Sequence, residues 1–99
     1  MPQGPFQVVS LGEANSRSLN ITANTVVKTT PGFIVSVSVV VAGSAAGGVY
    51  DATTIAAGVA ATQIAVTPAT AGVYAVNFPA TSGIVVKPGT GQTIAISYN

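Results

Sequence analysis

The stretch from Phe33 to Val41 alternates apolar and small polar side chains with a period of two residues. In an extended chain, one face would carry Phe33, Val35, Val37, Val39 and Val41. Ser36 and Ser38 would lie on the opposite face. This alternation is typical of a strand that buries one side of a sheet. The sequence therefore predicts a β-protein in which the valine face of this strand packs into the core.

Seven further short segments are rich in Val, Ile, Thr or Tyr and are separated by Gly, Pro, Asn or Thr. They predict strands at residues 19–23, 26–30, 49–51, 63–67, 72–78, 84–87 and 93–98. Pro31-Gly32 suits a type II turn, and Lys87-Pro88-Gly89 repeats the same turn chemistry. Residues 52–62 are expected to form a loop with one helical turn. The sequence thus predicts an all-β fold, a single jelly-roll-like β-sandwich of about eight short strands.

The 99 residues suit one domain with a distinct beginning. Residues 1–18 hold two of the six prolines, a short apolar patch and then a polar run. We expect this segment to be an N-terminal arm or an edge strand, and residues 19–99 to form the sandwich domain.

Charged side chains are unusually scarce along the whole chain. They make up 5% of the residues, whereas an ordinary soluble domain has roughly 25%. The five are Glu13, Arg17, Lys28, Asp51 and Lys87. Because charge normally keeps a protein dispersed, we expect much of this surface to be covered by other molecules, as in a subunit of an assembly.

The same scarcity argues against several functional classes. A net charge of +1 is too small to neutralise a nucleic-acid backbone. The chain has neither Cys nor His, so we expect no metal site and no cofactor. A serine nucleophile would have few candidate bases, and no catalytic motif is recognisable, which predicts that the chain is not an enzyme.

Two uncharged stretches favour ordinary structural roles. Residues 29–50 alternate with period two and are interrupted by Ser and Gly, which argues against a membrane-spanning helix. Gly89-Thr90-Gly91 lacks the third glycine of a dinucleotide fingerprint and is expected to be a turn.

Asp51 is expected to accept backbone hydrogen bonds from Thr53 or Thr54.

Five segments of the chain carry a resemblance to a known family. They are Thr29-Thr30-Pro31-Gly32, residues 35–43, Gly48-Val49-Tyr50-Asp51, Gly83-Ile84-Val85-Val86 and residues 88–98. Together they resemble capsid decoration, or cement, proteins of tailed bacteriophages, over about residues 20–99. The resemblance implies a β-sandwich bound as an oligomer to the outside of the head, on the virion exterior, with no catalytic residues.

The leading hypothesis is a head decoration protein that binds the major capsid protein and self-associates, with a homotrimer favoured and a dimer possible. The N-terminal segment is the expected arm, with Phe6, Val8 and Leu11 as apolar anchors and Arg17 as a partner for a carboxylate. The alternatives are a phage tail or head-fibre component, a carbohydrate- or surface-binding β-module that uses its tyrosines, and an oligomeric membrane-inserting sheet.

Overall fold

The structure is a computed structural model, and it describes residues 16–99. Within these residues the chain forms eight strands and one turn of 3-10 helix, η2 (Ala60–Thr62). The strands are β1 (Ser16–Ile21), β2 (Thr25–Lys28), β3 (Gly32–Val41), β4 (Gly47–Tyr50), β5 (Gln63–Thr67), β6 (Gly72–Ala80), β7 (Ile84–Lys87) and β8 (Thr93–Tyr98).

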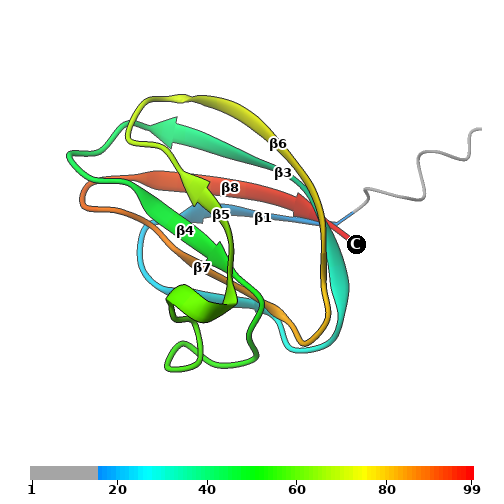
Figure 1. Cartoon of the computed structure of the whole chain (residues 1–99). Coiled ribbons are helices and arrows are strands. Elements are labelled where there is room, and N and C mark those ends of the chain that lie inside the picture. The colour runs from blue at the N-terminus through cyan, green and yellow to red at the C-terminus, as the bar shows by residue number, and fades with distance from the viewer. Residues whose placement is uncertain (1–15) are drawn as a thin grey trace, which may run out of the picture.

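The strands form two four-stranded antiparallel sheets that pack together as a sandwich (Figure 1). One sheet has the order β1-β8-β3-β6, and the other has the order β2-β7-β4-β5. The pairs β4·β5, β3·β6, β2·β7 and β1·β8 therefore nest within one another around the β4–β5 connection. The all-β sandwich of eight short strands is confirmed, whereas the jelly-roll-like topology stays a prediction.

Local sequence patterns locate the strands well. Every predicted strand overlaps an observed one, and β5, β7 and β8 have the predicted bounds. At the start of the described chain, residues 16–18 lie in β1, where they pair with Tyr98, Ser97 and Ile96 of β8. Arg17 is therefore a residue of the sandwich.

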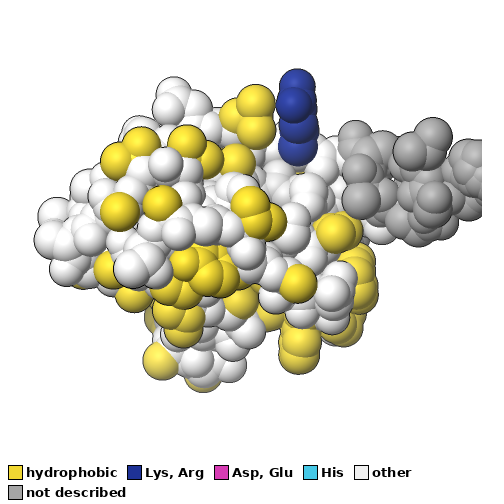
Figure 2. All heavy atoms as spheres, turned by 90° about the horizontal axis from the view of Figure 1, so that it is seen from above, with side chains coloured by type: hydrophobic (Ala, Val, Ile, Leu, Met, Phe, Trp, Pro, Cys, Tyr) yellow, Lys and Arg dark blue, Asp and Glu magenta, His cyan; other side chains and the backbone are white. Residues whose placement is uncertain are grey.

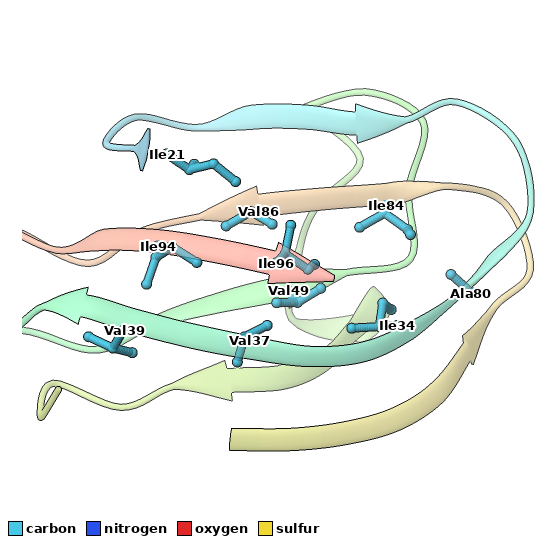
Figure 3. Close-up of a cluster of buried hydrophobic side chains, with 10 residues drawn as sticks. All are labelled: Ile21, Ile34, Val37, Val39, Val49, Ala80, Ile84, Val86, Ile94 and Ile96. Atoms are coloured by element: carbon cyan, nitrogen blue, oxygen red, sulfur yellow. The ribbon is translucent and has the colours of Figure 1, made fainter. Parts of the chain in front are cut away.

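The core lies between the two sheets and consists of branched aliphatic side chains (Figure 3). Its buried members are Ile21, Ile34, Val37, Val39, Val49, Ala80, Ile84, Val86, Ile94 and Ile96. Burying a Val or Ile side chain stabilises a fold by about 1.5–3 kcal/mol, so this cluster supplies the main driving force for joining the sheets.

The face of β3 differs from the prediction at both ends of the strand. Val37 and Val39 are buried as expected, but Phe33 is 36% exposed and Val41 is 50% exposed. The register between β3 and β8 slips after Ile34 and again after Val39. Each slip is a β-bulge, which moves the following residues to the other face. The prediction that Phe33 and Val41 share the buried face is therefore wrong, and Ile34 takes the buried place instead.

One end of the sandwich is held by Asp51, which follows β4. Its carboxylate accepts hydrogen bonds from the backbone N–H groups of Thr81, Ser82 and Gly83, at 3.0, 2.7 and 3.3 Å, and from the Thr81 hydroxyl at 2.8 Å. The expected bonds from Thr53 or Thr54 are replaced by these bonds from the β6–β7 turn. Partial desolvation tends to raise the pKa of Asp51, but the four hydrogen bonds together hold that pKa below its usual value.

The opposite end is held by Gln92, which is buried. Its side-chain oxygen accepts bonds from the Thr67 hydroxyl and the Gly89 N–H, at 3.0 and 2.8 Å. Its side-chain nitrogen donates to the carbonyls of Thr67 and Pro68, at 3.0 and 2.6 Å. The amide therefore has a partner for both donor hydrogens and for its oxygen, and it ties the β7–β8 turn to the β5–β6 turn.

Candidate interaction surface

The sequence placed its candidate contact residues near the N-terminus. Phe6, Val8 and Leu11 lie outside the described residues, so their proposed role stays a prediction. Arg17 lies in β1, directly opposite Ser97 of β8, and its side chain is exposed. The structure therefore places Arg17 on the outer face of the β1-β8-β3-β6 sheet, since the neighbours that it alternates with face the core.

The other sheet is covered on its outside by the chain itself. Val85 alternates with the core residues Ile84 and Val86 and so faces outward, yet it is fully buried. It pairs with Tyr50, whose ring lies 5.3 Å from the amino group of Lys87. Lys87 also donates a hydrogen bond to the carbonyl of Gly58. The β4–β5 connection is thereby fastened across this face and shields it from water.

The outer face of the β1-β8-β3-β6 sheet has no such cover within residues 16–99, and we call it the bare face. Pairing across the four strands aligns Arg17, Ser97, Ser36 and Ala75 in one row, and Ala95, Ser38 and Val73 in the next. Six of the nine large hydrophobic side chains that are exposed belong to this sheet. They are Leu19, Phe33, Val40, Val41, Val73 and Phe78. Exposed apolar groups thus concentrate on one of the two sheets.

Charge is nearly missing from the bare face. Four charged residues lie in the described chain, and of these only Arg17 belongs to the β1-β8-β3-β6 sheet. The hydroxyls of Ser36 and Ser97 are 2.9 Å apart and hydrogen-bond to each other. Figure 2 shows one side of the molecule, where hydrophobic side chains mix with uncharged surface and dark blue appears at one place. Such a surface loses little electrostatic hydration when another molecule covers it.

The bare face is hollowed only to a small extent. Its hollow has a volume of about 170 Å³ and lies among Arg17, Leu19, Ser36, Ser38, Ala95 and Ser97. Ligand pockets are typically about 300–1,000 Å³ and enclose most of the ligand. This geometry suits contact with a broad macromolecular surface better than capture of a small molecule.

Residues 16–99 show neither a cluster of metal-ligating side chains nor a helix that could span a membrane. This part of the chain holds no group of three or more acidic, His or Cys side chains that could bind a metal ion. None of its helices has the length and apolar character needed to cross a membrane.

Comparison with protein-family models, with curated proteins and with solved structures finds no match to this chain. The resemblance to capsid decoration proteins therefore rests on the sequence segments described above.

Sequence reasoning missed Val73, the most exposed large apolar side chain of the bare face, which is 74% exposed. A signal for it was present in β6, because Val73 and Ala75 alternate with Tyr74 and Val76. A strand that is apolar on both faces is typical of a sheet that is covered on both sides. Here the second cover is not supplied by residues 16–99.

Proposed function

We propose that this chain is a non-enzymatic structural protein that decorates and stabilises a bacteriophage capsid. In this proposal it binds the outer surface of the major capsid protein lattice as a homo-oligomer and resides on the virion exterior. Support comes from the resemblance of its strand and turn segments to decoration proteins, and from the scarcity of charge. No cofactor takes part in this role.

The bare face is the single observation that carries the proposal. A standard protein–protein interface buries about 800 Å² on each partner, and its centre is depleted of charge. A broad, shallow sheet face with apolar side chains and one arginine has this character. On a repeating lattice, linked weak contacts gain about 10²–10⁴ in avidity, so no single contact has to be strong.

The test is co-sedimentation with expanded capsids built from the cognate major capsid protein. Val73→Asp places a charge on the bare face and is expected to weaken capsid binding at least about tenfold, because burying an unpaired carboxylate is costly. Val66→Asp is the matched control. Val66 lies on β5, in the other sheet, and is 55% exposed, so this variant is expected to bind like the wild type.

Two results would count against the proposal. Wild-type protein that stays in the supernatant with every capsid preparation would show that the chain does not bind capsids. Equal binding by Val73→Asp and wild type, with both folded by circular dichroism, would show that the bare face is not the contact.

A tail or head-fibre component is the nearest alternative, and immunogold labelling of virions separates it from a head protein. A carbohydrate-binding module that uses its tyrosines would need those three rings to be accessible. The three tyrosines are instead half-buried: Tyr50 packs beside Lys87, and the Tyr74 hydroxyl donates to the carbonyl of Thr70 at 2.9 Å. This favours the structural role, and a glycan array that shows no specific binding is the expected result.

A further inference from the structure

The four sheet edges of the sandwich differ in how they are protected. Exposed strand edges carry unpaired N–H and C=O groups that pair readily with another chain, and proteins usually block them with charge, bulges or short length. β1 carries Arg17 and a bulge between Ser18 and Ile21. β2 has four residues, carries Lys28 and is also bulged. On β5 the side-chain amide of Gln63 donates to the carbonyl of Ala65 at 3.2 Å. Three of the four edges therefore have a visible block.

The fourth edge, β6, lacks these protections along its first half. Residues 72–75 are in unbroken register with β3, and no described strand pairs with their other side. None of the nine residues of β6 is charged. The block comes only later in the strand, where the register slips beside Asn77, which has a φ of +50°, and where Pro79 lacks an N–H. A short, neutral stretch with unbroken register thus remains open to strand pairing.

We propose that β6 pairs antiparallel with β6 of a second copy of this chain, about a two-fold axis near Tyr74. In a two-fold contact each residue meets itself or its near neighbour, so a charged edge would face its own like charge. The edges β5 and β6 carry no charge and avoid this penalty, and β6 is the one of the two that is left open, so its neutral edge fits that of a second copy. The contact gives a dimer, the smaller of the two assemblies that the sequence left open.

The pairing has a consequence for the bare face. Joining two β6 strands creates one continuous eight-stranded sheet, in which the bare faces of both copies lie side by side. The dimer would then present twice the docking area to a lattice, with Val73 and Ala75 at its centre. This part of the inference rests on the proposed function, whereas the dimer itself does not.

Single cysteines provide a direct test, because the natural chain contains none. A register that keeps both bare faces on one side pairs Val73, Tyr74 or Ala75 with its own copy. Disulfides form when Cα atoms are about 4.4–6.8 Å apart. Val73→Cys or Ala75→Cys should therefore crosslink into covalent dimers under mild oxidation, or a mixture of the two variants should do so if Tyr74 lies on the axis. Val66→Cys, on the blocked β5 edge, is the control.

The expected result is crosslinking at least about tenfold above the Val66→Cys control in one of those three samples, at a protein concentration where sedimentation velocity detects dimers. Ala75→Lys is expected to shift the wild-type dimer toward monomer by at least about tenfold in dissociation constant, because it brings two like charges close to the two-fold axis. Crosslinking no greater than the control in all three samples, or a dimer that Ala75→Lys leaves intact, would overturn the proposal.

Leu19→Asp separates this inference from the proposed function. Leu19 lies on β1, at the opposite edge of the same sheet from β6. The variant is expected to remain a dimer while its capsid binding falls. Intact dimers with no capsid binding by the wild type would sink the proposed function alone, whereas capsid binding by an oligomer that crosslinks in none of the three cysteine samples would sink the β6 contact alone.

Discussion

At the scale of single residues, the fold depends on two polar side chains that make long-range hydrogen bonds. Gln92 and Asp51 each join turns that are distant in sequence, one at each end of the sandwich. Apolar packing in the core is not directional, so it does not fix the ends of the strands. The hydrogen bonds of Gln92 and Asp51 hold the turns in place there. Both residues are structural.

Gln92→Met tests the first of these bonds. The change keeps the length of the side chain but leaves buried groups of Thr67 and part-buried groups of Pro68 and Gly89 without these partners. We expect a loss of about 2–4 kcal/mol in the free energy of unfolding, measured by urea denaturation. Gln63→Met is the control, because Gln63 is exposed and makes one bond to its own strand, and a loss of under about 1 kcal/mol is expected. Equal losses would contradict the role assigned to Gln92.

The lowered pKa of Asp51 predicts how the stability of the protein changes in acid. Its pKa is lowered in the folded state, so the charged carboxylate contributes stability at pH values above the unfolded pKa of about 3.9. That contribution is lost as the pH falls below about 4 and passes through the lowered folded pKa. Thermal melts of the wild type between about pH 5 and about pH 2 should show this decline in stability.

Asp51→Asn supplies the comparison for this acid response. It should already be destabilised near neutral pH, by about 1 kcal/mol for a partly exposed group, and should show a flatter dependence on acid. Glu13 is the other acidic side chain of the sequence, so Glu13→Gln is the matched control and should keep the wild-type decline. An unchanged slope in Asp51→Asn would show that another group governs acid stability.

At the scale of elements, the two sheets acquire different outer faces because of one connection. The β4–β5 segment covers its own sheet through Lys87 and Gly58, while no described segment covers the other sheet. The bulges of β3 add to this difference, because they turn Phe33 and Val41 outward.

Lys87→Met tests whether this connection is fastened by the lysine. The variant keeps much of the apolar stem but cannot donate to the Gly58 carbonyl, so we expect faster amide hydrogen exchange at Gly58 and Val59. The loss in global stability should be about 1 kcal/mol. Lys28→Met makes the same change in charge on β2 and should leave exchange at Gly58 and Val59 unchanged. Unaltered exchange in Lys87→Met would show that the loop is held by other contacts.

At the scale of the whole molecule, the bare face, which carries Arg17 as its only charged side chain, and an uncharged edge meet along β6. Association through these surfaces should depend little on ionic strength, since salt screens charges and Arg17 is the only charged side chain on that sheet. We expect the dimer dissociation constant, from sedimentation equilibrium, to change by less than about threefold between roughly 0.05 and 1 M NaCl. A steep weakening of the dimer in salt would indicate an ionic contact instead.

The sequence by itself determined where the strands lie, because alternation and Pro-Gly turns act over a few residues. It placed β5, β7 and β8 with their observed bounds, and it predicted a helical turn in the 52–62 loop, where η2 is found. It also predicted Val37 and Val39 as buried, since the period-two pattern holds between the two bulges.

Tertiary structure alone decided the partners and the faces. The bulges that expose Phe33 and Val41 arise from pairing with β8, more than fifty residues away in sequence. The partners of Asp51 and Gln92 lie in other turns of the sandwich, which no local pattern indicates. Which sheet is covered depends on where the β4–β5 connection packs. Local preference favours a strand, but the free energy of burial is shared among distant strands, and so the exposed surface is settled only when the sheets come together.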